Sequence, residues 1–493
     1  MIKKIFGPPG TGKTTTLLNY VDQYIKNGTP LNRIGYFAFT RKAANEAKNR
    51  MLERNPNIKK KELLYFQTLH SLAFHTLGMS EENVMQSVHY EQLGKDLNIR
   101  VVDDGDESGY LNFNSEYFKV INKARVKDIS IEDEFNTNEW SREIDYETLD
   151  HIYLNYNHFK QAYNLDDFTD MIYKFVEHEE KCKTFDVIFI DEAQDLSPIQ
   201  WKMFDVLKQK SKDIYLAGDD DQAIFAWAGA DVDRFLNEPC DQEEILEESA
   251  RVPLSVQNLS NIILERIGTR KEKKYLPKKG SEGLVEEIYN MNHIDLTKDE
   301  WLILTRTTYR RDEVCKNLKQ NNIFYKTKYG KSIDTKLYKA ILTWGELCKG
   351  QQVSLSDIKD VYDFLFENFN EKKFKNKTLV NMDDLGYSKD IIWYDIFVNA
   401  DQNECFYIRN LLANGEKLSQ EPRIEVSTIH GAKGGECDNV ILVLDNSRKI
   451  RQSVELSIEK ADEEHRVWYV GATRAKENLY LLKPKVERRG YSL

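Results

Sequence analysis

The stretch GPPGTGKT at residues 7–14 decides the fold of this chain. A short apolar segment at residues 1–6 precedes it and predicts a buried strand, and an apolar-periodic helix follows it. Glycines let such a loop fold its backbone N–H groups around phosphates at a helix N-terminus. Lys13 adds positive charge, and the Thr14 hydroxyl can bind magnesium. The pattern is a Walker A motif and predicts a phosphate-binding site.

A second motif lies far along the chain. The apolar segment FDVIFI at residues 185–190 predicts a buried strand, and DEAQD follows it at residues 191–195. An acidic pair at the carboxyl end of a parallel strand can divide two tasks. Asp191 would hold magnesium, and Glu192 would position and deprotonate the attacking water. Together with the loop at residues 7–14, this Walker B pattern predicts nucleotide hydrolysis.

Length and composition set the class of protein. The chain has 493 residues with 41% hydrophobic content, so we expect two to four domains. It has neither an apolar run long enough to span a bilayer nor a signal peptide, which predicts an intracellular, cytoplasmic protein. The six cysteines form no CxxC pair, which argues against a disulfide framework or a zinc site. A net charge of −11 argues at first against nucleic acid, but 70 Lys and Arg residues leave room for a local basic groove.

These motifs and several others resemble those of UvrD/Rep-like superfamily 1 (SF1A) DNA helicases, and they occur in the order of that family. The other matching segments are FAFTRKAA (37–44), TLHSL (68–72), AGDDDQAIFAWAGA (217–230), Arg251, VSTIHGAKGGE (426–436) and YVGATRA (469–475). The resemblance implies an α/β fold with two RecA-like P-loop NTPase lobes, whose parallel sheets are flanked by helices. It also implies a mainly helical inserted domain in each lobe.

Domain boundaries follow from the resemblance and from the long stretches without motifs. Residues 301–304 and 439–444 predict parallel strands of a second lobe, so we expect nucleotide to bind between two lobes. The predicted units are a first lobe with the ATP site (1–74 and 183–250), a helical first insertion (75–182), a second lobe (251–332 and 421–493) and a shortened helical second insertion (333–420).

The resemblance implies roles for individual residues around ATP and Mg²⁺. Arginine suits the cleft because its fixed charge offsets the charge that develops on the transferred phosphoryl group. The implied catalytic residues are Glu192, Asp191, Lys13, Gln222, Arg251 and Arg474. The implied nucleotide-binding residues are Gly7, Pro8, Pro9, Gly10, Thr11, Gly12, Lys13, Thr14, Thr15 and Glu436, and the implied metal ligands are Thr14 and Asp191.

A single strand can be held by aromatic stacking without regard to sequence, because every base has a π-face. Phe39 and Trp227 are the best candidates for stacking, although a core role remains the alternative for any single aromatic residue. The other predicted DNA-binding residues are Thr40, Lys42, Thr68, His70, Phe225 and His430.

Three features leave alternatives open. Tyrosines of the first insertion fit either a surface that lines the approaching duplex or a packed bundle: Tyr90, Tyr110, Tyr117, Tyr153 and Tyr156. Ala250 stands where the family offers an aromatic residue to the base, and only six residues precede Gly7, so we expect relaxed nucleotide selectivity. Tyr491 could cap a short strand-splitting pin or belong to a frayed terminus.

Three functions compete on these grounds. The first is a monomeric, ATP-dependent DNA helicase that moves 3′ to 5′ on single-stranded DNA and opens single-strand–double-strand junctions in repair, replication or recombination. The second is a translocase that strips bound proteins from single strands with little unwinding. The third is a nucleotide-gated nucleic-acid binding module. RNA remains an alternative substrate, because stacking does not distinguish sugars.

Overall fold

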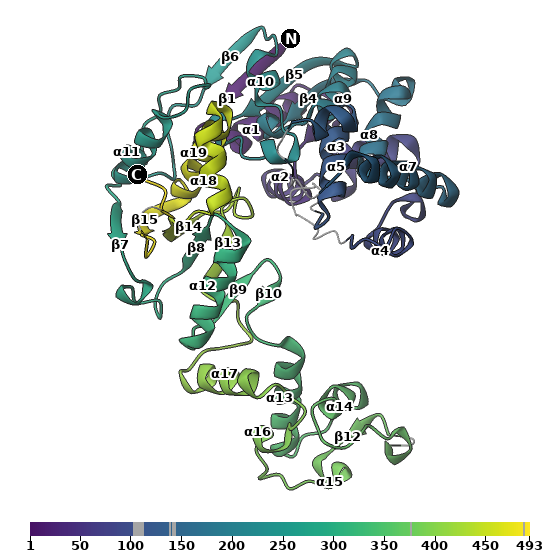
Figure 1. Ribbon diagram of the computed structural model, residues 1–493, viewed down its shortest axis with the longest axis vertical. Helices are drawn as coiled ribbons and strands as arrows, with labels where there is room; N and C mark the ends of the chain where they lie inside the picture. Colours follow the sequence, from purple (N-terminus) through teal and green to yellow (C-terminus); the bar gives the residue numbers. More distant parts are fainter. Residues whose placement is uncertain (102–112, 138–139, 141–143, 375–376, 487–488) are drawn as a thin grey trace.

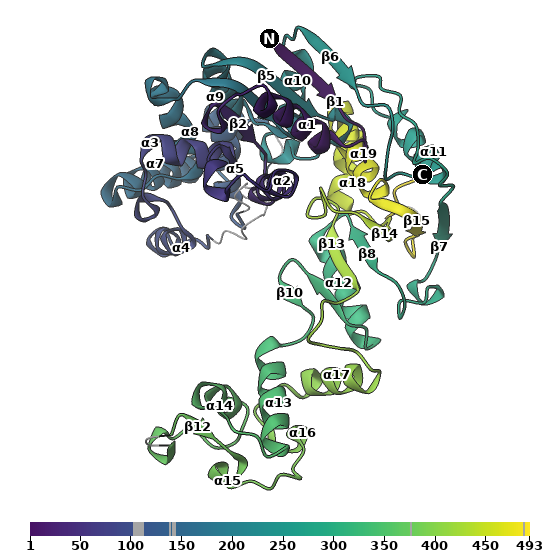
Figure 2. The ribbon, with the colours of Figure 1, turned by 180° about the vertical axis from the view of Figure 1, so that it is seen from behind.

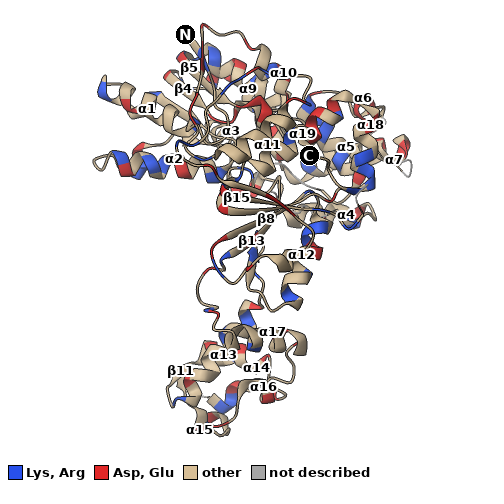
Figure 3. Ribbon diagram, turned by 90° about the vertical axis from the view of Figure 1, so that its left-hand side faces the viewer, with Lys and Arg blue, Asp and Glu red and all other residues tan. Residues whose placement is uncertain are grey.

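The structure is a computed structural model that describes residues 1–101, 113–137, 140, 144–374, 377–486 and 489–493. Two sheet-containing lobes lie next to each other, and a helical unit extends from one of them (Figures 1 and 2). Among the described residues, no helix is both long and apolar enough to cross a membrane. Basic and acidic residues occur on both lobes (Figure 3).

The first lobe is built on a six-stranded parallel sheet. In sheet order its strands are β3 (Phe66–Gln67), β2 (Ile34–Phe37), β4 (Phe185–Ile190), β5 (Ser211–Gly218), β1 (Ile2–Phe6) and β6 (Gln242–Ile245). Alternate residues of β4 enter two different cores: Ile188 packs on one face of the sheet and Val187 on the other. Burial on both faces explains the continuous apolar run in this strand.

The helices of the first lobe cover both faces of this sheet. They are α1 (Lys13–Lys26), α2 (Arg41–Arg54), α3 (Leu69–Leu77), α9 (Pro198–Gln209) and α10 (Val232–Asn237). Because all strands are parallel, the loops after β1, β2, β3, β4 and β5 leave the sheet at the same edge. The predicted segments at residues 7–14, 37–44, 68–72, 191–195 and 217–230 begin at or next to the carboxyl ends of these strands, so the fold gathers them.

The first insertion is a helical bundle in its described part. Its helices are α4 (Ser87–Asp96), α5 (Glu116–Lys127), α6 (Ile131–Phe135) and α7 (Tyr146–Tyr163). Helix α8 (Phe168–Glu177) instead packs against α3 and α9 in the core of the first lobe, so the bundle ends before the boundary predicted at residue 182. Tyr90 and Tyr156 are 2% exposed and belong to its core, against which Tyr117 and Tyr153 pack. The packed-bundle alternative therefore describes these four tyrosines, whereas Tyr110 lies outside the described residues. Helix α3 runs across the boundary predicted at residue 74.

The second lobe contains a seven-stranded sheet, parallel except for its β9–β10 pair. In sheet order the strands are β10 (Gly330–Lys331), β9 (Tyr325–Thr327), β13 (Ile424–Thr428), β8 (Trp301–Thr305), β14 (Cys437–Val443), β15 (Ala475–Leu482) and β7 (Leu284–Ile288). Its helices are α11 (Leu254–Leu264), α12 (Thr308–Gln320), α18 (Arg448–Leu456) and α19 (Ile458–Ala472). The predicted strands at 301–304 and 439–444 are β8 and β14, and the predicted two-lobed α/β fold is confirmed.

The second insertion has its own apolar core and extends away from both sheets (Figures 1 and 2). Its helices are α13 (Thr335–Cys348), α14 (Leu355–Tyr362), α15 (Met382–Leu385), α16 (Trp393–Ile396) and α17 (Gln402–Ala413). A small antiparallel pair joins β11 (Val353–Ser354) to β12 (Leu379–Val380). By contrast, α19 packs against the loop at residues 220–222, so the second lobe contacts the first close to the predicted site.

Candidate functional site

The loop at residues 7–14 connects β1 to α1, and glycine shapes its backbone. Gly10 and Gly12 have φ angles of 74° and 82°, in the left-handed region that glycine adopts without strain. The Lys13 ammonium folds back and donates a hydrogen bond to the Gly7 carbonyl at 2.9 Å. A lysine beside a helix N-terminus and a glycine-shaped loop suits the phosphates of a nucleotide.

Asp191 lies at the end of β4, directly beside this loop. The Thr14 hydroxyl donates to its carboxylate at 2.9 Å, and the Tyr36 hydroxyl donates to the same oxygen at 2.7 Å. Burial, reinforced by the charge of Glu192, raises the pKa of Asp191. Two adjacent oxygen ligands in a buried site match what Mg²⁺ prefers, and the ion would hold phosphate oxygens there. Tyr36 had no sequence signal, because an aromatic residue inside a strand is typical of a core.

Glu192 has an unusual backbone conformation that aims its side chain into the cleft. Its φ of 58° lies in the left-handed region, which costs a non-glycine residue roughly 1 kcal/mol or more. Gln194 donates to its carboxylate at 2.6 Å, and the Lys13 ammonium lies 3.9 Å away. Burial alone would raise the pKa of Glu192, but Lys13 and Lys433 outweigh it and lower the pKa to about 2. Glu192 is therefore ionised and able to accept a proton.

The opposite wall of the cleft comes largely from the second lobe. Arg474, 2% exposed, donates to the Gln222 side chain at 2.9 Å. Arg251 donates to the Glu436 carboxylate at 2.6 Å. Burial and the nearby charge of Arg251 lower the pKa of Arg474 to about 9, so the guanidinium stays charged at neutral pH. Two cations that disfavour each other would be stabilised by a polyphosphate between them.

Arg251 is held against the phosphate-binding loop by the segment that leads into the second lobe. The Ser249 hydroxyl donates to the Pro9 carbonyl at 2.8 Å, and the Ala250 amide donates to the Gly10 carbonyl at 2.9 Å. A Cβ atom on Gly10 would lie 2.4 Å from the Arg251 Cβ atom. Glycine at this position is thus needed both for its φ angle and for the close approach of Arg251.

Four of the predicted DNA-binding residues form one aromatic cluster, namely Phe39, Phe225, Trp227 and His430. Phe39 stacks on Phe225 with 5.5 Å between ring centroids, and Trp227 lies edge-on to His430 at 6.3 Å. Trp227 is 38% exposed, whereas Phe225 is 3% exposed. The Trp227 ring is therefore accessible from solvent, whereas the Phe225 ring is buried and packs against the other rings of the cluster.

The remaining predicted DNA-binding residues, Thr40, Lys42, Thr68 and His70, lie outside the aromatic cluster. Thr40 and Thr68 cap α2 and α3, because each hydroxyl accepts a hydrogen bond from a backbone amide of the first helical turn. Lys42 is exposed on α2. Burial, followed by the charge of Arg41, lowers the pKa of His70 to about 4, which leaves this ring neutral at physiological pH.

Lys433 connects the cleft to the aromatic cluster, a role that was not predicted from the sequence. Its ammonium donates to the Asp195 carboxylate and, at 2.7 Å, to the Gln222 carbonyl. The same ammonium lies 4.9 Å from the centroid of the Phe225 ring. Burial raises the pKa of Asp195 to about 7, against the influence of Lys433. Both residues belong to segments that carried the resemblance, so their place in those motifs was the available signal.

Asp219–Asp221 lie close enough together to suggest a metal site. The second lobe fills that space with cations instead. The buried Lys273 ammonium pairs with Asp219 at 3.2 Å and with Asp221 at 2.9 Å, and it also pairs with Asp220. Arg270 donates two hydrogen bonds to Asp221, at 2.8 and 2.7 Å. This buried network joins the two lobes and argues against a metal ion here.

Both predictions for Tyr491, the cap of a strand-splitting pin and part of a frayed terminus, are wrong. Its ring stacks on Trp468 with 4.9 Å between centroids, and its hydroxyl lies 2.7 Å from the His465 ring nitrogen. Its amide donates to the Leu444 carbonyl at 2.8 Å. Tyr491 is neither the tip of a pin nor part of a frayed end, because the apolar surface of α19 binds its ring.

The fold and the cleft together define a two-lobed P-loop NTPase whose phosphate site lies beside an aromatic cluster. The chain belongs to the UvrD/Rep family of helicases. Residues 3–242 match the UvrD/REP helicase N-terminal domain, and residues 423–482 match the UvrD-like helicase C-terminal domain.

Several curated proteins are similar to this chain. The probable DNA helicase II homolog of Mycoplasma pneumoniae is 23% identical in an alignment of length 587, gaps included, which covers 97% of this chain and 81% of that protein. The ATP-dependent DNA helicase PcrA of Staphylococcus aureus strain Mu50 is 25% identical over 293 residues, and that of Staphylococcus epidermidis is 24% identical over 295 residues. Each PcrA alignment covers 55% of this chain and 38% of the relative.

Proposed function

We propose that this protein is an ATP hydrolase and DNA helicase that moves 3′ to 5′ along single-stranded DNA and unwinds junctions in repair, replication or recombination. The family supports ATP-dependent DNA helicase activity. ATP binds between the lobes, with Mg²⁺ held by Thr14 and Asp191. The protein acts in the cytoplasm. It acts as a monomer, since the two lobes of one chain supply both walls of the cleft.

One observation carries this proposal: a single short loop serves both sites. Gln222 meets Arg474 in the cleft, and Phe225 and Trp227 follow on the same loop in the aromatic cluster. Lys433 holds the loop from the second lobe through the Gln222 carbonyl. A change in lobe position with nucleotide state therefore moves the rings that contact the strand, which is what a motor requires.

The residues of the cleft divide the work of hydrolysis. Lys13 and Arg474 neutralise phosphate charge from opposite walls, and Arg251 is held beside them by the phosphate-binding loop. Glu192 takes the proton of the attacking water, because it is ionised and fixed in place. Bound Mg²⁺ would supply further positive charge at the phosphate oxygens. Product release would then remove the anion that draws the two lobes together.

A translocase with little unwinding is the second candidate. Tyr491 packs against Trp468 within the second lobe, so it is not available as a wedge between strands. The second insertion also extends away from both sheets (Figure 1). Both observations favour movement along a single strand over efficient strand separation.

Duplexes with a 3′ or a 5′ single-stranded tail test these functions, together with displacement of streptavidin from biotinylated single strands. Unwinding of the 3′-tailed duplex alone is the expected result. Streptavidin displacement without unwinding would identify the translocase. ATP-dependent binding with neither activity would indicate the nucleotide-gated module, and equal action on RNA tails would broaden the substrate.

A further inference from the structure

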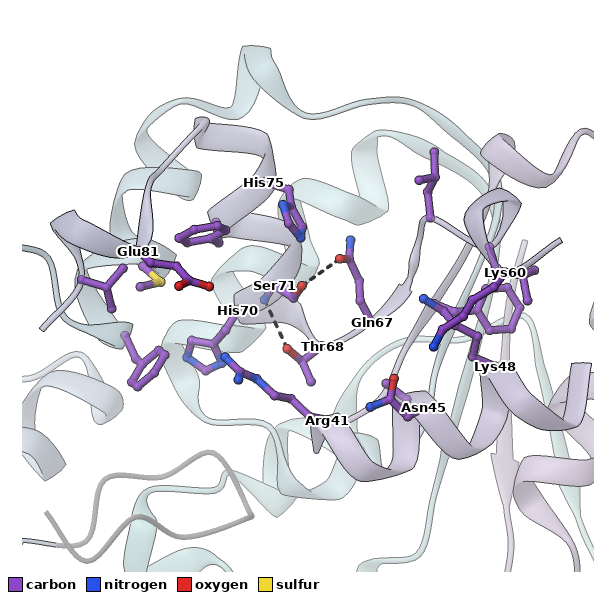
Figure 4. Close-up of a pocket in the computed structure, with 18 of the residues that line it drawn as sticks. Arg41, Asn45, Lys48, Lys60, Gln67, Thr68, His70, Ser71, His75 and Glu81 are labelled. Atoms are coloured by element: carbon purple, nitrogen blue, oxygen red, sulfur yellow. Dashed lines mark hydrogen bonds between the residues drawn. The ribbon is translucent and has the colours of Figure 1, made fainter. Parts of the chain in front are cut away.

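A cavity of about 850 Å³ lies between the first lobe and the first insertion. Helices α2 and α3 and the segment at residues 60–68 form the wall from the lobe, and residues 81–87 form part of the opposite wall. Figure 4 shows the side chains that surround it. The motifs assigned above account for only part of this lining, because Lys48, Lys60 and Lys61 belong to none of them.

Among the described residues that line the cavity, cationic side chains outnumber carboxylates. Its lining includes Arg41, Lys48, Lys60 and Lys61, and none of these four has an ion pair with a described residue. Glu81 is the one carboxylate among the described lining residues, and it lies across the cavity from Lys48 and Lys60 (Figure 4). Burial, with the charge of Lys60, lowers the pKa of Lys48. An anion in the cavity would relieve this repulsion.

The cavity continues the line of the aromatic cluster. His70 lines this cavity and also a much smaller one beside Phe39. Arg41 extends toward His70 from the start of α2 (Figure 4). A strand that stacks on Phe39 and passes His70 would therefore enter the cavity next. The cluster binds bases through ring faces, whereas the cavity offers cations for the backbone.

The arrangement of the cations fits an extended anion better than a compact one. Arg41 lies apart from Lys48 and Lys60 along the wall, so the charges do not converge on one point (Figure 4). A phosphodiester backbone carries one charge per nucleotide and matches such spacing. The lining also includes the accessible apolar side chains of Leu64 and Phe74, which can accept sugars or bases.

We propose that this cavity binds successive backbone phosphates of the nucleic-acid strand beyond Phe39, through Lys48, Lys60 and Lys61. The proposal rests on the proposed function and extends the strand's path past the family motifs. The cavity then contributes to the affinity for the strand through charge and not through the identity of the bases.

Salt dependence of binding provides the first test. The variant Lys48→Gln/Lys60→Gln/Lys61→Gln is compared with a control, Lys26→Gln/Lys181→Gln/Lys279→Gln, which removes equal charge from exposed sites outside the cavity. For a long single strand, the slope of log K against log salt concentration should fall by about 2, since each phosphate contact contributes about 0.7. Affinity should fall on the order of 10- to 100-fold near 0.1 M salt. The control should keep the wild-type slope.

Neutral methylphosphonates, placed one at a time along the oligonucleotide, separate direct contact from a folding defect. In the wild type, two or three adjacent replacements should weaken binding, and in the cavity variant the same replacements should have no further effect. Two results would overturn the cavity proposal while leaving strand binding intact: methylphosphonates that weaken binding of the variant as much as that of the wild type, or a salt slope that the lysine substitutions do not change. Displacement of the strand by polyglutamate from the wild type but not from the variant would instead indicate an acidic peptide site and would also overturn it. A wild type that binds no single strand would remove the proposed function itself.

Discussion

Lys433 of the second lobe donates a hydrogen bond to the carboxylate of Asp195 in the first lobe, and the Asp195 side chain is 1% exposed. The same ammonium holds the Gln222 carbonyl at 2.7 Å. One side chain thus fixes the loop after β4 and the loop after β5 to the second lobe. Because these loops hold Glu192 and Phe225, the contact links hydrolysis to the strand-binding rings.

Replacing Lys433 should break that link. In Lys433→Met, stimulation of ATP hydrolysis by single-stranded DNA should fall about tenfold or more, because the loops lose their common anchor. The buried Asp195 also loses its partner, at a cost of up to roughly 3–5 kcal/mol. Asp195→Asn/Lys433→Met should regain stability in urea unfolding without regaining stimulation. Full stimulation in Lys433→Met would show that the contact is only structural.

Glu192 is expected to act in the chemical step alone. Glu192→Gln keeps the shape of the side chain but removes the group that accepts a proton, so turnover should fall by roughly 10²-fold or more while nucleotide binding persists. Fluorescent-nucleotide titration and steady-state ATP hydrolysis measure the two quantities separately. Wild-type turnover in this variant would exclude Glu192 as the base.

Trp227 should contribute to strand affinity without contributing much to stability. Trp227→Ala should weaken single-strand binding by roughly 1–3 kcal/mol, the usual value of one base stack, with little change in the melting temperature. Tyr289→Ala is the matched control, since Tyr289 is 73% exposed and lies outside the aromatic cluster. Equal effects of the two substitutions would return Trp227 to a role in packing.

Lys273 should be essential to the stability of the interface between the two lobes. Lys273→Met leaves Asp219–Asp221 without their main counter-ion, and removal of one partner of a buried ion pair typically costs about 3–5 kcal/mol. Thermal unfolding should show this loss. Lys271→Met provides the comparison, because the Lys271 side chain is 36% exposed and pairs with an exposed glutamate. A similar melting temperature in both variants would be inconsistent with a structural role for the network.

Two histidines near the proposed path of the nucleic-acid strand, His70 and His430, should make the stability of the protein depend on pH. Burial lowers the pKa of His70 to about 4 and that of His430 well below its ordinary value of 6.5. Below about pH 6.5 these histidines therefore bind protons in the unfolded chain but stay neutral in the folded protein. The free energy of unfolding consequently falls as pH drops from 6.5 toward 4. Between about pH 7.5 and 5, His70→Asn/His430→Asn should lose less unfolding free energy than the wild type. An identical loss would mean that neither ring is held neutral.

The sequence predicted the parts of the site that depend on short, contiguous patterns. The loop at residues 7–14 and the acidic pair after β4 have a fixed spacing relative to their strands, so their positions follow from the parallel sheet. Lys273 and Asp219–Asp221 are more than fifty residues apart, and their pairing depends on how the two lobes pack. The place of Tyr491 against Trp468 likewise depends on tertiary contacts that no local pattern encodes.

The steady-state rate of ATP hydrolysis, measured with and without single-stranded DNA, tests the central claim most directly. Coupling between the cleft and the aromatic cluster predicts a rate that rises at least tenfold or so with saturating DNA in the wild type, and much less in Trp227→Ala. An identical rate with and without DNA in the wild type would contradict the account.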